Sequence, residues 1–333
     1  MTDAKYDVLG IGNAIFDVLV HADEAFLAKH AMTKGSMALI DEARAAAIYR
    51  DMGPATEMSG GSGANTIVGL ASLGARAAYV GKVRDDQIGR MYSHDIRAAG
   101  VTFDTAPATD GPATGCCYIL VTPDGERTMN TYLGAAQNLT AADIDPAQIA
   151  AARIVYLEGY LWDPKEVKEA FVKAATVAHD AGLEVALTLS DSFCVDRYRE
   201  EFLDLMRGGT VDIVFANEAE LHSLYQTSDF DGALKQLRED ATLGIVTRSD
   251  KGCVVVSNDG VIAVPAHPIE TLVDTTGAGD LFAAGFLFGL VRKTGYEMAG
   301  RLGGLAAAEV IQHIGARPQV SLKELAAQNG LKA

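Results

Sequence analysis

The sequence is short of positive charge. Lysine and arginine together number 28, against 44 aspartate and glutamate residues, which gives a net charge of −16 at pH 7. A surface field of that sign repels polyanions and anionic membranes. We therefore expect neither nucleic acid nor a membrane among the partners, and any phosphate that the chain binds must be held by local chemistry.

Membrane-spanning and secretory signals are missing as well. The longest apolar stretch, around residues 282–291, is too short to cross a bilayer. The first seven residues have neither the basic nor the apolar region of a secretory signal. These absences predict a cytoplasmic protein.

Cysteine is scarce, with four residues in 333. Cys116 and Cys117 are adjacent, which is not the C-x-x-C spacing of a zinc site, and no second pair supports one. We interpret these two, and Cys194 and Cys253, as reduced packing residues.

Hydrophobic residues are abundant, at 49% of the chain, which is enough for a large buried core. Short apolar runs alternate with segments of helical periodicity and lie at 8–12, 77–80, 154–157, 185–189, 213–216, 244–247 and 253–256. Apolar strands separated by helices are typical of a parallel sheet covered on both faces. No repeat or long linker divides the chain, so we expect one α/β unit over residues 1–333 rather than two tethered domains.

Two regions break this alternation. Residues 18–39 contain a helix-like stretch at 24–30, and residues 112–132 alternate like antiparallel strands around a turn at 123–126. Such strands can form a small sheet that stands off the main one. A cover of that kind would keep water from a reactive phosphoryl group.

The most specific local pattern is Asp-Thr-Thr-Gly-Ala-Gly-Asp at 274–280, directly before an apolar helix. Gly277 and Gly279 let the backbone approach an anion, and free N–H groups at a helix start stabilise negative charge. Asp280 should be ionised there and able to accept a proton from a substrate hydroxyl. An anion hole beside a carboxylate supplies what phosphoryl transfer needs. An ordinary capped helix after a glycine turn is the alternative interpretation.

A second glycine cluster, Gly-Gly-Ser-Gly-Ala-Asn at 60–65, opens another expected helix at 66–73. Small residues permit backbone contact with a compact polar ligand, and Asn65 can both donate and accept a hydrogen bond. No Gly-Lys-Ser/Thr ends the cluster, which excludes a Walker P-loop. A flexible turn without a ligand is the other interpretation.

The first expected strand ends in Gly-Ile-Gly-Asn-Ala-Ile-Phe-Asp at 10–17. Ile15 replaces the third glycine of a dinucleotide fingerprint, and no acidic residue follows a second strand at the usual distance, so a dehydrogenase is disfavoured. Asn13 and Asp17 lie where open α/β sheets bind ligands, and their side chains suit contacts with vicinal hydroxyls.

Two patterns follow strands in the second half of the chain. Asn217 and Glu220 fall on one face of an expected helix, and an amide with a carboxylate can hold the water shell of Mg²⁺. A simple capped helix start is the alternative interpretation. The turn at 247–252 can meet ATP phosphates or can merely connect a hairpin.

In combination, the cluster at 60–65, Asn217-x-x-Glu220 and the string at 274–280 resemble the motifs of the PfkB, or ribokinase-like, family of carbohydrate and nucleoside kinases. Further matches at 81–86 and 112–115 extend the resemblance over most of the chain. It implies a three-layer α/β/α core with a mostly parallel central sheet and a small β lid. The lid would be built from about residues 13–40 and 109–134.

The resemblance also implies a role for each matching residue. Asp280 is implied to be the general base, with the backbone of Gly277, Ala278 and Gly279 as the anion hole. The acceptor hydroxyls are implied to be held by Asn13, Asp17, Gly60, Gly61 and Asn65. ATP and Mg²⁺ are implied to be held by Arg127, Asn217, Glu220, Thr247, Ser249, Gly252, Gly277 and Gly279. Ser249 stands where these kinases usually have glycine. Many relatives bind a monovalent cation such as K⁺ around the position of Asp274.

Within the family the chain is similar to the adenosine kinases, through a helical insertion at 24–37, Gly-Tyr-Leu-Trp at 159–162, and Arg127, which matches their phosphate-contacting lid arginine. A purine is then implied to lie among Leu39, Met129, Leu161 and Phe193. The expected reaction is ATP-dependent phosphorylation of the 5′-hydroxyl of adenosine by a monomer or homodimer. Ribose, fructose, inosine or guanosine as the acceptor stays open. A non-catalytic nucleotide-binding protein is disfavoured by Asp280 and its flanking glycines.

Overall fold

The computed structural model describes residues 4–331, and its largest element is an eight-stranded sheet with the order β13-β12-β11-β10-β9-β8-β1-β5. The strands are β1 (Val8–Ile11), β5 (Ala77–Val80), β8 (Ile154–Glu158), β9 (Glu184–Thr188), β10 (Ile213–Asn217), β11 (Leu243–Thr247), β12 (Cys253–Ser257) and β13 (Gly260–Val264). From β5 to β11 all neighbours are parallel, and β12 and β13 continue the sheet antiparallel. The predicted apolar runs are therefore the strands of a mostly parallel sheet, as expected.

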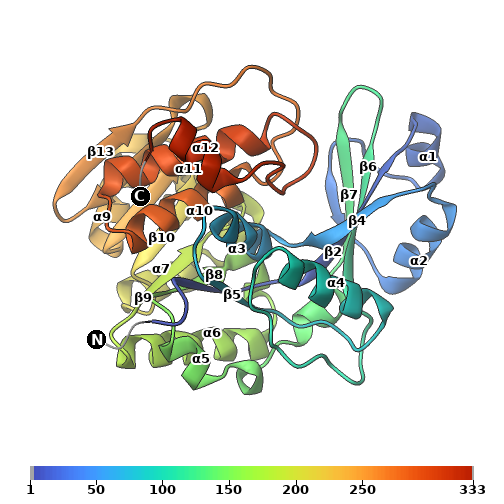
Figure 1. The fold of residues 1–333 in the computed structure, drawn as a ribbon, viewed down its shortest axis with the longest axis horizontal. Coiled ribbons are helices and arrows are strands. Elements are labelled where there is room, and N and C mark those ends of the chain that lie inside the picture. Colours follow the sequence, from blue (N-terminus) through green and yellow to red (C-terminus); the bar gives the residue numbers. More distant parts are fainter. Residues whose placement is uncertain (1–3, 332–333) are drawn as a thin grey trace.

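Helices cover both faces of this sheet (Figure 1). One face packs on α3 (Ser62–Ser72), α10 (Ala278–Val291), α11 (Tyr296–Val310) and α12 (Leu322–Gln328). The other face packs on α5 (Pro146–Ala150), α6 (Lys165–Asp180), α7 (Ser192–Arg207), α8 (Glu218–Tyr225) and α9 (Phe230–Asp240). Alternate residues of one strand serve the two layers, as in β8, where Tyr156 faces the first and Leu157 the second. This arrangement confirms the predicted three-layer core.

A five-stranded sheet with the order β3-β7-β6-β2-β4 stands beside the larger body (Figure 1). Its strands are β2 (Ile15–His21), β3 (Met37–Leu39), β4 (Thr56–Gly60), β6 (Gly115–Val121) and β7 (Arg127–Tyr132), accompanied by α1 (Glu24–Lys29) and α2 (Glu42–Asp51). The lid predicted from 13–40 and 109–134 omitted β4, because Met58 is the one large apolar residue in its sequence Thr-Glu-Met-Ser-Gly, which leaves no apolar alternation. Closure of this sheet over a ligand stays a prediction.

The remaining elements connect these parts. They are α4 (Gln87–Ala98) and the 3₁₀ turns η1 (Gly134–Asn138), η2 (Ala141–Asp143), η3 (Gly159–Trp162) and η4 (Ser249–Lys251). The four cysteines are unpaired and buried, as predicted. Within residues 4–331, each helix is either too short or too polar to cross a membrane.

Helix α10 is deeply enclosed, with every residue from Leu281 to Gly289 buried. It packs on α11 through glycine, because a Cβ added at Gly285 would lie 2.5 Å from the Leu302 carbonyl carbon and 2.6 Å from the Gly303 nitrogen. Backbone-to-backbone contact at that point fixes how far the first turn of α10 projects toward the edge of the sheet.

We expect Gly285→Ala to lower the free energy of unfolding by about 1–3 kcal/mol, because the new methyl group meets backbone that cannot rotate away. Urea unfolding measures the change. Gly53→Ala is the matched control, since a Cβ there meets no atom within 4 Å. An equal loss in the two variants would contradict the helix-contact explanation.

Candidate active site

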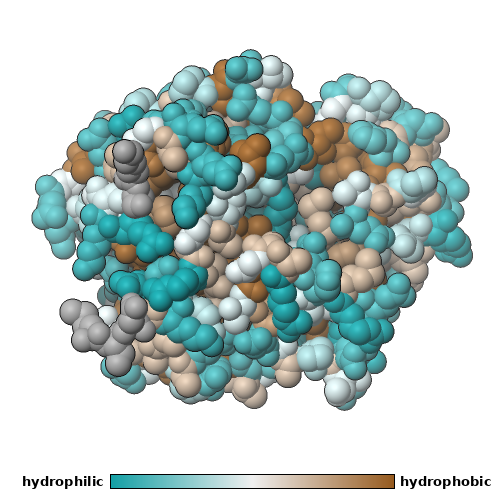
Figure 2. Space-filling view, in the orientation of Figure 1, coloured by the Kyte–Doolittle hydropathy of each residue, from teal (hydrophilic) through white to brown (hydrophobic). Residues whose placement is uncertain are grey.

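A cavity of about 1850 Å³ opens between the small sheet and the carboxyl ends of the parallel strands. Figure 2 shows it as a furrow between the larger body and the part that carries the small sheet. Its volume exceeds that of a typical site for one small molecule. Among the predicted site residues, those that line it are Asn13, Asp17, Leu39, Gly61, Asn65, Met129, Phe193, Asn217, Glu220, Thr247, Ser249, Gly252, Gly277, Ala278, Gly279 and Asp280.

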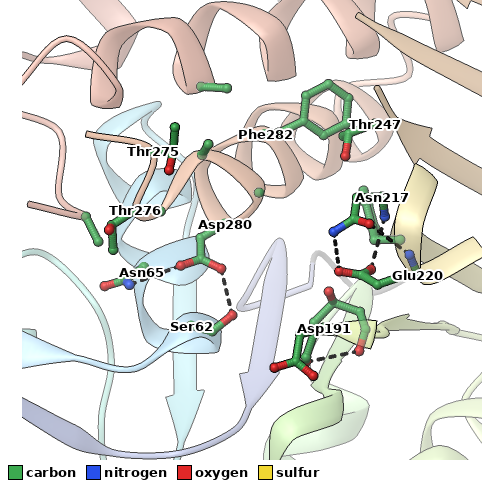
Figure 3. A pocket seen from close by; sticks show the side chains of 18 of the residues that line it. Ser62, Asn65, Asp191, Asn217, Glu220, Thr247, Thr275, Thr276, Asp280 and Phe282 are labelled. Carbon is green, nitrogen blue, oxygen red and sulfur yellow. Dashed lines mark hydrogen bonds between the residues drawn. The ribbon is translucent and has the colours of Figure 1, made fainter. Parts of the chain in front are cut away.

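Asp280 lies in the first turn of α10 and points into this cavity between Ser62 and Asn65 (Figure 3). Its Oδ1 accepts a hydrogen bond from Ser62 Oγ at 2.6 Å, and its Oδ2 accepts one from Asn65 Nδ2 at 3.1 Å. Burial raises the pKa of Asp280 to about 6, although the two hydrogen bonds and the Arg317 charge oppose that rise. The carboxylate is therefore still ionised at pH 7 and can accept a proton.

The predicted anion hole lies directly before Asp280. Gly277 has φ = 80°, a left-handed conformation that favours glycine, and it caps the helix. The first intrahelical bond from this turn is Leu281 N to Gly277 O at 2.8 Å, so the N–H groups of Gly279 and Asp280 have no acceptor within the helix. A Cβ at Gly279 would meet no atom within 4 Å, which leaves open space in front of these N–H groups.

The glycine cluster faces Asp280 from the start of α3, which begins at Ser62 rather than at the predicted residue 66. Gly61 has φ = 94°, and any side chain there would collide with the Asn13 carbonyl oxygen. Gly60 does not line the cavity, contrary to its predicted binding role. A Cβ at Gly60 would instead strike the Asp17 carboxylate, so this glycine provides room for Asp17.

Two amide oxygens in the cavity lack partners. Among residues 4–331, Asn13 Oδ1 and Asn65 Oδ1 are buried without a hydrogen-bond donor, and both residues line the cavity. A buried acceptor left unpaired costs on the order of 1–3 kcal/mol, which a ligand hydroxyl would recover. These orphaned atoms support the predicted contacts with acceptor hydroxyls.

Glu158 is a cavity residue that the sequence reasoning missed. Its side chain is 1% exposed and accepts hydrogen bonds from Asn13 Nδ2 at 2.7 Å, Asn13 N at 3.2 Å and Gly63 N at 2.8 Å. It thereby holds Asn13 against the glycine cluster. The sequence did contain a signal for this residue, because Glu158 is the one charged residue of β8 and ends its apolar run.

Three carboxylates share this end of the cavity. Burial raises the pKa of Asp17 and of Glu158 to about 7 each, and the negative charge of Asp280 contributes to both shifts. Arg317 and Arg127 act in the opposite direction on the pKa of Asp17. The site therefore concentrates groups that bind protons more tightly in the folded chain than in the unfolded chain.

Apolar side chains line the cavity on the small-sheet side and on α7. Leu39 is 55% exposed and Phe193 is 77% exposed, although both are large and apolar. Met129 of β7 lies beside Met37 across the parallel pairing of β3 and β7, and both side chains line the cavity. The prediction for Leu161 is wrong, because η3 turns this side chain into the core, where it is 1% exposed, and presents Tyr160 to the cavity instead.

Asn217 and Glu220 start α8 as a reciprocal cap on another side of the cavity (Figure 3). Glu220 accepts from Asn217 N at 3.0 Å and from Asn217 Nδ2 at 2.5 Å. Burial raises the pKa of Glu220 to about 7, and none of the ion pairs found in residues 4–331 includes it. A buried carboxylate without a cationic partner suits a nearby Mg²⁺. The described residues contain no cluster of three or more metal-binding side chains.

The turn 247–252 also borders the cavity. Ser249 has φ = 51°, a left-handed conformation that favours glycine. Arg248 pairs with Glu218 at 3.1 Å and lies 3.8 Å from the Phe230 ring centre. Ser249 thus has the backbone conformation that the expected glycine would favour.

Arg127 and Asp274 form an ion pair away from the cavity lining. Asp274 also accepts hydrogen bonds from Gly315 N and Thr276 N, both at 3.0 Å. Burial alone would raise the pKa of Asp274, but these bonds and the Arg127 charge lower it overall. The structure thus places Arg127 on Asp274, and a contact of its guanidinium with phosphate stays a prediction. Its Nε is buried and has no acceptor among residues 4–331, so one donor stays unused in this arrangement.

The free energy of unfolding should decrease as the pH rises from about 5 to about 7. Asp17, Glu158 and Asp280 have folded pKa values of about 7, 7 and 6, above the values of 3.8, 4.5 and 3.8 for unfolded groups. The folded chain therefore binds more protons over this range, and deprotonation favours the unfolded chain. Urea unfolding at several pH values measures the slope.

Glu158→Gln should flatten that slope, because it removes one of the carboxylates whose pKa is raised. Exposed Glu239 on α9 provides the control, and Glu239→Gln should leave the slope unchanged. Stability that rises steadily from about pH 5 to pH 7 would contradict the assignment of raised pKa values.

Comparison with known proteins gives a consistent result. Residues 52–322 match the model of the pfkB family of carbohydrate kinases. The crystal structure of an adenosine kinase from Sinorhizobium meliloti is 54% identical, with a TM-score of 0.91, over 98% of this chain and 100% of that chain. A probable sugar kinase from Rhizobium etli CFN 42 is 51% identical, with a TM-score of 0.92, over 99% of this chain and 100% of that chain. Fructokinase-1 of Oryza sativa subsp. japonica is 30% identical over 70% of this chain and 74% of its own length.

Proposed function

The chain belongs to the pfkB family of carbohydrate kinases, and from that premise we propose that it transfers the γ-phosphoryl group of ATP to the 5′-hydroxyl of adenosine, giving AMP and ADP. The observation that carries the proposal is the position of Asp280 beside the Gly277–Gly279 turn, facing unpaired amide oxygens and apolar side chains in one cavity. The 54% identity to the Sinorhizobium meliloti adenosine kinase supports adenosine as the acceptor.

The acceptor end of the cavity binds and orients the nucleoside. Asn13 and Asn65 offer their unpaired oxygens to ribose hydroxyls, and Asp17 offers a carboxylate beside them. Leu39 and Phe193 supply apolar surface for the purine. With the acceptor seated, Asp280 takes the proton of the 5′-hydroxyl, while Ser62 and Asn65 hold its carboxylate in place.

The donor end stabilises the charge that moves with the phosphoryl group. The N–H groups of the first turn of α10 and the open space at Gly279 receive the negative oxygens. Thr247, Ser249 and Gly252 border the same space. Mg²⁺ would be held through water by Glu220 and Asn217, and when bound it neutralises phosphate charge.

A monovalent cation at Asp274 does not fit the arrangement seen here. The carboxylate already pairs with the Arg127 guanidinium and accepts two backbone N–H groups.

A plain sugar is the second candidate acceptor. The 51% identity to a probable sugar kinase favours it, and the hydroxyl-binding residues would serve a sugar equally well. The two candidates differ in their use of the apolar side chains Leu39, Met129 and Phe193, for which a sugar has little need.

An acceptor panel separates the candidates. With MgATP, the value of kcat/KM for adenosine should exceed that for ribose or fructose by about a hundredfold, because burial of the purine contributes binding energy. ADP release measures the rates, and mass spectrometry of the product should identify AMP. Ribose or fructose turned over as well as adenosine would overturn the choice of acceptor.

Replacing the general base tests the chemistry. Asp280→Asn should lower kcat by a factor of about 10² to 10⁴ while the KM of the acceptor changes little, since the amide keeps the shape but cannot take the proton. Asp231→Asn is the control, because Asp231 is also an aspartate in the first turn of a helix but is exposed on α9. Near-normal turnover of the Asp280 variant would refute the role of Asp280.

A further inference from the structure

Three consecutive residues after α11 contact both ends of the proposed active site. Gly315 N donates to Asp274 Oδ2 at 3.0 Å, in the loop that leads to the anion hole. Ala316 packs closely on Gly277, since a Cβ added at Gly277 would lie 2.8 Å from the Ala316 Cβ. Arg317, the third residue, reaches the glycine cluster of the acceptor end. The segment 315–317 therefore joins the donor and acceptor ends.

The guanidinium of Arg317 bonds to both sides of the glycine cluster. Its Nη2 and Nε donate to Ser59 O at 2.6 Å and 3.2 Å, its Nη2 also reaches Ser59 Oγ at 3.2 Å, and its Nη1 donates to Ala64 O at 3.2 Å. Ser59 is held in turn by Asp95, which accepts from Ser59 N at 2.7 Å and from Ser59 Oγ at 2.6 Å. Ser59 and Ala64 enclose Gly61 and Ser62, so the planar fork of one arginine sets the position of the turn between them.

The charge of Arg317 is directed at the site carboxylates. None of the ion pairs found within residues 4–331 includes Arg317, and its hydrogen bonds go to the uncharged oxygens of Ser59 and Ala64. Its positive charge lowers the pKa of Asp17 and of Asp280. The other titratable groups that face Asp280 are Asp17 of β2, Tyr156 and Glu158 of β8 and Tyr160 of η3. All of these groups are acidic. Arg317 is the cation that lowers the pKa of Asp280, and it acts on Asp17 together with Arg127.

We propose that Arg317 is a positioning residue of the kinase reaction: it fixes the turn that presents Gly61, Ser62 and Asn65, and it supplies the positive charge that faces Asp280 and Asp17. The proposal rests on the proposed function, since it assigns a task toward the general base and the acceptor. Arg317 itself need not touch either substrate.

Two substitutions separate the electrostatic part of this role from the positional part, because one removes the positive charge and the other keeps it. Arg317→Gln removes the cation, which raises the pKa of Asp280, so the acid limb of the profile of kcat/KM against pH should move to higher pH by about one unit. Arg317→Lys keeps the cation but loses the fork, so the acid limb should stay in place. Both variants should lose between about tenfold and a hundredfold in kcat/KM at neutral pH, because the turn shifts.

Arg97→Gln is the matched control. Arg97 also donates to a backbone carbonyl through Nε and Nη2, at Phe103 O, but it lies on α4 away from the cavity. This variant should leave both the acid limb and kcat/KM unchanged. Urea unfolding of all variants reports the loss of stability separately.

The assay uses the full chain with MgATP and the acceptor that the wild type turns over with the highest kcat/KM. A failure of adenosine as the acceptor is then visible in the wild type before any variant is compared. An acid limb that does not move in Arg317→Gln overturns the electrostatic part of the proposal. Unchanged kcat/KM in folded Arg317→Lys overturns the positional part of the proposal. If Arg317→Gln does not fold, the kcat/KM of Arg317→Lys still tests that part.

Discussion

The burial of α10 is the constraint on which the rest of the site depends. A helix apolar on all sides has to lie inside the protein, and backbone contact with α11 at Gly285 leaves it no freedom to slide. The position of its first turn at the carboxyl edge of the sheet is therefore fixed. The N–H groups of that turn and the Asp280 carboxylate are held in place by the same packing that stabilises the fold.

The electrostatic character of the cavity follows from this position. The chain carries a net charge of −16, and Asp17, Glu158, Glu220 and Asp280 add buried or half-buried carboxylates to a cavity meant for a polyanionic donor. Attraction must therefore come from directed groups, namely the N–H groups at the start of α10 and a metal ion that Glu220 would help to hold. Each of them acts over a short distance, which favours a bound phosphate over polyanions in general.

Much of the architecture could be predicted because its signals are local. Each apolar run is a strand of the large sheet. The segments 60–65 and 274–280 each lie at the start of a helix, and residues of both line the cavity. What could not be predicted depends on contacts distant in sequence. β4 joins the small sheet by pairing with β2, although its own residues carry no strand pattern. Leu161 turns inward because η3 is a tight turn. Glu158 binds Asn13, which is 145 positions away in the sequence, and Arg317 binds Ser59, which is 258 positions away. Contacts over such distances are formed only by the folded chain.

The size of the cavity has a consequence for the course of the reaction. One continuous space of about 1850 Å³ contains the base, the anion hole and the proposed acceptor contacts, so donor and acceptor can be bound together. No residue then has to carry the phosphoryl group between two separate sites. A single in-line displacement inverts the configuration at phosphorus, whereas passage through a phosphorylated side chain would retain it. A chirally labelled γ-phosphate would record which course the reaction takes.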